Sequence, residues 1–168
     1  MEITDGNLKS FKDRKFPKKV CFKPIGVIHS PYKDLKGIPI QATMSDTKGE
    51  IEIFSQYANG LKELKEFSHL FCLYIFDMVR LPAPLLSKPF LEDKIKGVFS
   101  IRTPFRPNPI GLSILEIIEL KQNIIYVNNL DILDKTPVID IKPYIPQFDF
   151  RDTDKIGWLK DKIRDKTS

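Results

Sequence analysis

Closely spaced glycines are absent from this sequence, and their absence excludes the common nucleotide-binding loops. All eight glycines are separated from one another by more than ten positions. A GxGxxG fingerprint and a Walker loop both need neighbouring glycines, because these let the backbone approach a phosphate closely. We therefore do not expect a Rossmann-type nucleotide fold.

Metal-binding and disulfide signatures are also missing. The two cysteines, Cys21 and Cys72, stand alone in apolar segments, and the two histidines, His29 and His69, are forty positions apart. Zinc sites of familiar spacing need such residues in close pairs, so we predict no metal site. Isolated cysteines in apolar segments are typical of buried free thiols in a reducing compartment.

Long apolar runs are absent as well. The longest clear run covers 70–76. A membrane-spanning helix needs roughly 20 apolar residues, which this run does not approach. The first twenty residues are charged and contain no apolar core of a secretion signal. We expect a cytoplasmic protein without a membrane segment.

The residues that are present favour one mainly β domain. The chain has 168 residues, is 42% hydrophobic and contains 12 phenylalanines, which suffices for one sizeable core. Closely spaced apolar runs predict many strands, and one firm helix is predicted over 58–67. This pattern favours a β-barrel or curled sheet with a few short helices over a wound βαβ sheet. The predicted strands cover 22–29, 49–54, 70–78, 97–101, 110–120, 124–127 and 138–141, with a hairpin turn at 121–123.

Three parts are predicted along the chain. Residues 1–20 form a basic, flexible extension, residues 21–148 form the β-barrel domain, and residues 149–168 form a short C-terminal extension with a helix over 155–164. The net charge is +5, and part of this excess is concentrated near the N-terminus. Such a segment either binds a polyanion such as RNA or is a solvated tail, and the sequence leaves both interpretations open.

The strongest candidate site is the stretch Arg102-Thr-Pro-Phe-Arg-Pro-Asn-Pro-Ile-Gly111. Its three prolines fix the backbone, so the stretch loses little entropy when it binds a ligand. Arg102 and Arg106 can each form paired hydrogen bonds with a carboxylate or a phosphate. The alternative is a proline-rich connector, although a connector needs neither this rigidity nor two arginines.

Three weaker candidates lie elsewhere. The turn 134–137 could bind a ribose or an amine and Asp140 could act as a base, although aspartate and proline are ordinary turn residues. His69 follows the predicted helix and is either an acid–base group or a structural histidine. Gln41 could hydrogen-bond an adenine edge, but a single glutamine in a loop is a weak signal.

These segments, in this order, resemble the TsaA-like family of TrmO-type tRNA methyltransferases. The resemblance runs through 25–32, 66–70, 97–111 and 134–144. The Arg-Pro-Asn-Pro-Ile-Gly block and the Thr-Pro-Val-Ile-Asp-Ile-Lys-Pro-Tyr block are highly specific when they occur together. The resemblance implies a β-barrel enzyme outside the Rossmann class, usually a homodimer.

The resemblance also implies an activity and a site. Family members bind S-adenosylmethionine and methylate N6 of N6-threonylcarbamoyladenosine at position 37 of threonine tRNA. Arg106 and Asn108 are expected to contact the tRNA, and Asp140 and His69 are candidates for the catalytic base. The expected cofactor-binding residues are Pro39, Gln41, Asp77, Met78, Arg102, Leu112, Asp134, Lys135, Thr136 and Pro137.

Three departures from the family pattern keep other functions open. Ile40 and Asp77 stand where an arginine and a histidine are often found, and the further C-terminal domain of longer relatives does not follow Phe148. The alternatives are a methyltransferase of the same fold with another RNA or a small molecule as substrate, and a non-catalytic module that binds RNA or senses the cofactor.

Overall fold

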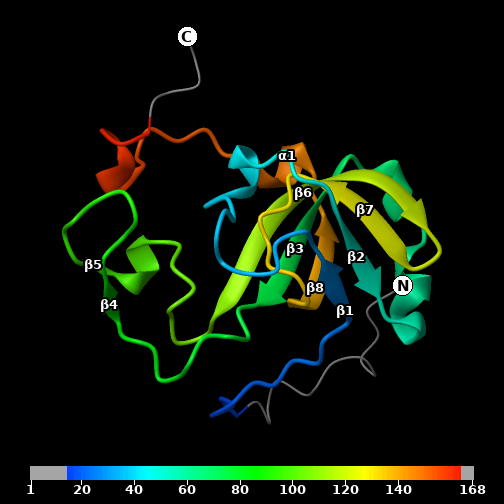
Figure 1. The fold of residues 1–168 in the computed structure, drawn as a ribbon, viewed down its shortest axis with the longest axis horizontal. Coiled ribbons are helices and arrows are strands. Elements are labelled where there is room, and N and C mark those ends of the chain that lie inside the picture. The colour runs from blue at the N-terminus through cyan, green and yellow to red at the C-terminus, as the bar shows by residue number, and fades with distance from the viewer. Residues whose placement is uncertain (1–14, 164–168) are drawn as a thin grey trace.

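A closed antiparallel barrel forms the body of the protein (Figure 1). The computed structural model describes residues 15–163. The barrel strands are β1 (Gly26–His29), β2 (Gly49–Ile53), β3 (His69–Ile75), β6 (Ile110–Lys121), β7 (Ile124–Asn128) and β8 (Pro137–Pro143). Around the barrel they follow in the order β1, β2, β7, β6, β3, β8, and β8 pairs with β1 to close it. The predicted mainly β, barrel-like fold is confirmed.

Alternating side chains fill the barrel interior. Successive side chains of a strand point to opposite faces, and in β3 the interior positions are Leu70, Cys72 and Tyr74. Their partners on β6 include Leu115, opposite Leu70, and Ser113, opposite Cys72. The remaining fully buried barrel side chains are Ile28, Ile51, Ile125, Val127 and Val138, and two loop residues, Leu130 and Ile132, complete the core.

The segment 58–67 does not form the single helix predicted for it. Two 3₁₀ helices, Ser55–Leu61 and Leu64–Glu66, occupy this segment in place of one α-helix. Glu63 lies between them in the left-handed region with φ +67°, which interrupts helical hydrogen bonding. Leu61 and Leu64 are nevertheless buried, as their spacing predicted, so the amphipathic face survives the change in helix type.

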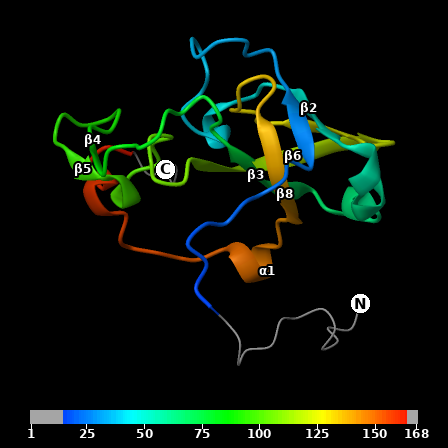
Figure 2. The same ribbon diagram turned by 90° about the horizontal axis from the view of Figure 1, so that it is seen from below.

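A small side lobe, defined here as residues 79–105, stands beside the barrel in both Figure 1 and Figure 2. It contains the two-stranded sheet of β4 (Leu86–Ser87) and β5 (Lys96–Gly97). The strand predicted over 97–101 is therefore wrong beyond Gly97. The chain turns instead through a 3₁₀ helix, Val98–Ser100, because this turn allows Val98 and Ile101 both to be buried.

The two ends of the described chain also differ from expectation. The first strand begins at Gly26 instead of position 22, and residues 1–14 of the predicted flexible extension lie outside the described residues. After the short helix α1 (Pro146–Asp149), the predicted helix over 155–164 is reduced to one 3₁₀ turn, Gly157–Leu159. Gly157 has φ +61°, so a regular α-helix that starts at 155 cannot continue through this residue. The last position of that prediction, Arg164, lies outside the described residues.

No helix within residues 15–163 is long and apolar enough to cross a membrane.

Candidate functional site

The loops that carry the predicted cofactor-binding residues meet at one end of the barrel. β1 ends there at His29, which pairs with Glu50 near the start of β2, and β3 ends there at Ile75, which pairs with Ile110 at the start of β6. β8 starts at this end, because it runs antiparallel to both β1 and β3. We call it the loop end. The loops 30–48, 76–109 and 129–136 therefore converge although they are far apart in sequence.

A side-chain hydrogen bond joins two of the predicted residues across this end. The Arg102 Nη1 group donates to Gln41 Oε1 at 2.7 Å, across 61 positions of sequence. The Gln41 amide group also donates through Nε2 to the carbonyl of Ile40 at 2.7 Å, which fixes the orientation of its oxygen. A guanidinium group has five N–H donors, and this pair uses one of them. The pair is exposed, so Arg102 can still donate to an anionic group.

The turn before β8 uses its aspartate to hold two loops together. Asp134 Oδ1 accepts a hydrogen bond from the Ser30 amide at 2.9 Å, and Oδ2 lies 2.7 Å from Lys33 Nζ. The hydrogen bond from Lys33, followed by that from the Ser30 amide, lowers the pKa of Asp134. The next residue, Lys135, has φ +64°, and Thr136 is buried. The Asp134 carboxylate is therefore engaged within the protein.

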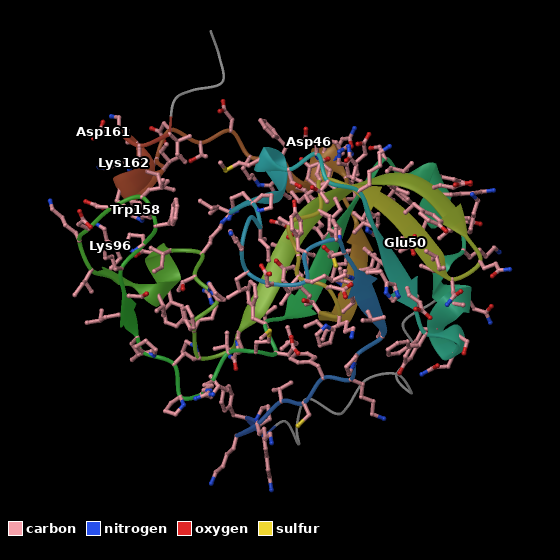
Figure 3. The ribbon with its side chains drawn as sticks, in the orientation of Figure 1. Asp46, Glu50, Lys96, Trp158, Asp161 and Lys162 are labelled. Atoms are coloured by element: carbon pink, nitrogen blue, oxygen red, sulfur yellow. The ribbon has the colours of Figure 1, made fainter. Side chains whose placement is uncertain are left out.

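A shallow pocket lies beside this turn. It has a volume of about 410 Å³ and is formed by the end of β1, the start of β2 and the Asp134 turn. Figure 3 labels Glu50, one of its lining residues, on the barrel. In this lining Lys33 and Asp134 pair with each other, and the Glu50 carboxylate is the other acidic group.

Apolar side chains surround the same end without being covered. Met78 follows β3 and is 72% exposed, and Leu112, the third residue of β6, is 58% exposed on the outer face of the barrel. Asp77 lies in the same turn as Met78, which the Val79 amide closes by donating to Phe76 at 3.0 Å. Exposed apolar side chains next to polar ones are typical of a surface that binds an amphipathic ligand.

The proline-rich stretch leads from the end of the side lobe into β6 and is partly exposed. Arg106 points back along it, and its Nη1 group lies 3.5 Å from the carbonyl of Ile101. The Asn108 carbonyl accepts a hydrogen bond from the Ile110 amide at 2.8 Å, which leads the chain into β6. Both side chains therefore lie on the same loop as Arg102, at the loop end.

Of the two candidate bases, only His69 lies far from the loop end, whereas Asp140 pairs with Leu73, which pairs with Leu112 on its other side. His69 starts β3 opposite Glu116, whereas the loop end is reached at Ile75, and six steps along a strand span roughly 20 Å. The Asp140 carboxylate lies 2.7 Å from Lys142 Nζ. Asp140 also lines a second pocket of about 400 Å³, which includes Ile25, the residue before β1, and therefore opens toward the opposite end.

Sequence analysis missed a polar chain that runs from the barrel interior to the loop end. Ser113 Oγ donates to Asp131 Oδ1 at 2.6 Å, and the Tyr74 hydroxyl lies 3.3 Å from Ser113 Oγ. Because the serine proton is directed to Asp131, Tyr74 is the donor to Ser113. Burial raises the pKa of Asp131, and hydrogen bonds from Ser113 and the Ala42 amide reduce that shift. The signal that could have revealed it is a single acidic residue inside the apolar stretch 130–133.

Within residues 15–163, no group of three histidine, cysteine, aspartate or glutamate side chains is arranged to hold a metal ion.

Comparison with known proteins identifies a family. The family described as "tRNA-methyltransferase O N-terminal domain" matches residues 27–150. A probable S-adenosyl-L-methionine-binding protein of Pyrococcus abyssi is 45% identical over 148 residues, which cover 88% of this chain and 80% of that protein. The tRNA (adenine(37)-N6)-methyltransferase of Escherichia coli is 39% identical over 135 residues, which cover 74% of this chain and 57% of that protein.

Solved structures agree with the family match. The crystal structure of TrmO from Pseudomonas aeruginosa superposes with a TM-score of 0.69 at 29% identity, and the match covers 83% of this chain and 62% of that one. This chain thus spans less than two thirds of the E. coli methyltransferase and of that TrmO structure, but four fifths of the Pyrococcus protein. With most of its length matched by the family, this chain belongs to the tRNA-methyltransferase O N-terminal domain family.

Proposed function

We propose that this protein is an S-adenosylmethionine-dependent tRNA methyltransferase that modifies N6 of the adenosine at position 37. The observation that carries the proposal is the Arg102–Gln41 hydrogen bond, which unites two expected cofactor residues from separate loops. Relatives named as S-adenosyl-L-methionine-binding proteins and as tRNA (adenine(37)-N6)-methyltransferases support it. The cytoplasm, where tRNA is modified, is the expected location.

The side chains at the loop end fit the chemistry of this cofactor. S-adenosylmethionine combines a carboxylate, an ammonium group, a sulfonium cation and an apolar adenine ring. Arg102 offers guanidinium donors to the carboxylate, and the Gln41 amide offers a hydrogen-bonding edge. Met78 and Leu112 offer exposed apolar surface to the ring. The donor set and the apolar surface therefore match an amphipathic, zwitterionic ligand.

The turn before β8 would hold the polar part of the cofactor through its backbone. Since the Asp134 carboxylate already binds Ser30 and Lys33, we assign it the role of fixing this turn. The left-handed conformation of Lys135 shapes the backbone between Asp134 and Thr136. Pro137 and Pro39 stiffen the two loops, which lowers the entropy lost on binding. Asp77, in the turn after β3, would face the ammonium or sulfonium group.

The cofactor, when bound, supplies a methyl group that is activated by its attachment to a sulfonium. The protein's own contribution is alignment of the acceptor nitrogen with that methyl group and removal of water. Such alignment accounts for on the order of 7–11 kcal/mol of barrier reduction in favourable cases. As the carbon–nitrogen bond forms, the methyl–sulfur bond of the cofactor would break to leave a neutral thioether, and the acceptor nitrogen would lose its proton. Since His69 lies at the far end of β3, we propose that this proton goes to Asp140, which lies in the same row of the barrel as Leu112, or to a polar acceptor in the loops.

We further propose N6-threonylcarbamoyladenosine of threonine tRNA as the substrate. The carbamoyl carbonyl and the purine both withdraw electrons from N6, so its proton is more acidic than that of a free amine and needs a weaker base. Arg106 and Asn108, on the same loop as Arg102, would contact the tRNA backbone. Methyl transfer to tRNA that carries the threonylcarbamoyl group, but not to tRNA that lacks it, is expected. Equal labelling of the two would exclude this substrate.

A homodimer is the proposed assembly. Ile114 and Ile118 lie on β6 and are 40% and 48% exposed, which leaves apolar surface that a second copy could cover. Analytical ultracentrifugation at several protein concentrations tests this. A single monomeric species at all concentrations would reject it.

Binding of the cofactor is tested by calorimetry with S-adenosylmethionine. The wild type should bind, and Arg102→Ala should bind at least tenfold more weakly, because a charge-assisted hydrogen bond contributes about 1.5–3 kcal/mol. Lys62→Ala is the matched control, since its 84% exposed side chain lies between the two 3₁₀ helices near the opposite end. No binding by the wild type would overturn the enzyme proposal.

A methyltransferase of the same fold with another substrate is the second candidate. Ile40 favours it, because a 46% exposed isoleucine takes the place of a cation next to Gln41. Cofactor binding without methylation of either tRNA would support this alternative.

A further inference from the structure

The single tryptophan of the chain is held against the side lobe by a specific hydrogen bond. The Trp158 indole Nε1 group donates to the carbonyl of Ser100 at 2.8 Å, across 58 positions of sequence. Lys96 Nζ lies 5.7 Å from the centre of the indole ring, within the range of a cation–π interaction. Figure 3 shows Trp158 and Lys96 close together at the side lobe, away from the barrel.

The lysine in this contact is itself held in place. Lys96 Nζ lies 2.9 Å from a Glu92 carboxylate oxygen, and the two side chains are only 22% and 15% exposed. The hydrogen bond from Lys96, and then the charges of Lys96, Lys162 and Lys94, lower the pKa of Glu92. The C-terminal segment therefore places the Trp158 ring beside Lys96 and the Lys162 charge near Glu92.

The carbonyl that Trp158 binds belongs to the turn that leads to Arg102. Val98 and Ile101 in this turn are 1% and 7% exposed, and the Val98 amide donates to the carbonyl of Leu85 at 3.0 Å. Arg102 follows directly and reaches Gln41 on another loop. One connected path thus runs from Trp158 through the Ser100 turn to the Arg102–Gln41 pair.

We propose that the segment 157–163 is a positioning element for the cofactor site, and that Trp158 is its principal positioning residue. The inference rests on the proposed function, since it assigns the segment a role at the same site. The segment lies beyond the family match, which ends at residue 150. The side lobe has only two strands of two residues each, so it has little regular structure of its own to hold Arg102.

The physical reason is preorganisation. A lobe held together by few backbone hydrogen bonds samples several arrangements. A ligand that binds only one arrangement has an affinity that is reduced in proportion to the fraction of molecules in that arrangement. The indole N–H donor and the stacked lysine favour the arrangement in which the Ser100 turn points Arg102 toward Gln41. The hydrogen bond of Trp158 goes to the Ser100 backbone carbonyl, so in this proposal Trp158 acts through the backbone and not on the reacting groups.

The test replaces Trp158 with phenylalanine, which keeps an aromatic ring for Lys96 and removes the N–H donor. We expect the KM for S-adenosylmethionine to rise roughly fivefold, while kcat at saturating cofactor stays within twofold, because one hydrogen bond corresponds to about that factor. Phe150→Leu is the control, since this residue belongs to the same extension, is 66% exposed and should leave both constants unchanged. A KM equal to that of the wild type would overturn the positioning role.

Hydrogen exchange without cofactor tests the contact independently of activity. In Trp158→Phe, amides of residues 84–102 should exchange at least threefold faster than in the wild type, and amides of β3 and β6 should be unchanged. Unchanged exchange in the side lobe would overturn the proposal, and faster exchange throughout the barrel would assign Trp158 a role in global stability instead. If the wild type binds no S-adenosylmethionine, the proposed function is rejected, and the role of Trp158 at the cofactor site is rejected as well. If wild type and variant bind equally, only the role of Trp158 fails.

Discussion

The ring of Tyr74 on β3 lies directly over Gly111 on β6, so that a methyl group at position 111 would occupy the space of the ring carbons. The two residues are paired across the strands, and the tyrosine ring is buried inside the barrel. The single glycine of the Arg102–Gly111 stretch therefore serves the barrel core. It allows the Tyr74 hydroxyl to reach Ser113 and the polar chain that ends at Asp131.

We expect Gly111→Ala to lower the free energy of unfolding by about 1–3 kcal/mol, the usual cost of forcing extra atoms into a packed core. Denaturant unfolding measures the change. Gly97→Ala is the matched control, since Gly97 has φ −66° and no atom within 4 Å of its would-be Cβ. Equal stability of the two variants would show that the Tyr74 ring moves aside freely.

The Asp131 carboxyl predicts a stability that decreases with pH. Burial raises its pKa in the folded state, so between the ordinary carboxyl pKa and the raised value the folded protein holds more protons than the unfolded one. The contribution of Asp131 is therefore favourable at low pH and is lost as the pH rises through this window. Asp131→Asn removes the titration while keeping an oxygen that can accept from Ser113.

The measurement is the difference in unfolding free energy between Asp131→Asn and the wild type across the acidic range. This difference should move in favour of the variant as the pH rises. A difference that does not depend on pH would contradict the raised pKa. Because both proteins share all other carboxyl groups, their titrations cancel in the comparison.

The Asp134 carboxyl predicts the opposite pH dependence, a stability that increases with pH. Lys33 and the Ser30 amide lower its pKa, so its stabilising contribution is present above the ordinary carboxyl pKa and is lost as the pH falls through the lowered value. Asp134→Asn should cost about 1 kcal/mol near neutral pH, a modest figure because the Lys33 side chain is 69% exposed and the ion pair is screened by solvent. Thermal unfolding at neutral and at strongly acidic pH should show the cost shrinking with acidity. A loss of stability that does not change with pH would show that the substitution acts through side-chain packing and not through the charge of Asp134.

The Arg102–Gln41 pair predicts non-additive effects on cofactor affinity. If the two side chains act as a unit, Arg102→Ala and Gln41→Ala together should cost less than the sum of the single changes. We expect a coupling of about 0.5–1.5 kcal/mol, the size of one hydrogen bond. Calorimetry on the four proteins of the cycle measures it. Strict additivity would mean that the two residues contact the cofactor independently.

The two cysteines should differ sharply in reactivity. Cys72 is fully buried, and burial, with a smaller contribution from the Asp131 charge, raises the pKa of its thiol, whereas Cys21 is exposed. A thiol reagent at mildly alkaline pH should therefore modify one group per native chain, and mass spectrometry of peptides should locate it at Cys21. In denaturant both should react. Modification of Cys72 in the native protein would show that the barrel opens readily.

Most barrel strands were predictable because each is a short apolar run, such as the run 70–76 that marks β3. Leu70, Cys72 and Tyr74 fill the interior where a period of two places them. The type of the helix before β3 was not predictable in this way, since a 3₁₀ turn and an α-helix bury Leu61 and Leu64 on similar faces. The left-handed conformation of Glu63, which separates the two turns, cannot be recognised from the spacing of the apolar residues.

The contacts of the candidate site could not be predicted from the sequence. The residue types and the proline-rich stretch pointed to Arg102, but its partner Gln41 lies 61 positions away and was a weak candidate by itself. Asp131 and Trp158 were missed for the same reason, because each acts through a residue on a distant segment. Such pairs become visible when the barrel has brought the loops together.

Closure of the barrel has a consequence for how this protein is made. The first strand is completed by the last one, through pairs such as Gly26 with Val138, more than 100 positions apart. A nascent chain therefore carries unpaired strand edges until β8 has left the ribosome, and such edges are the surfaces through which partly made chains aggregate. The loops 30–48 and 129–136 meet at that same late step, so we expect the protein to gain cofactor affinity only when synthesis of the barrel is finished.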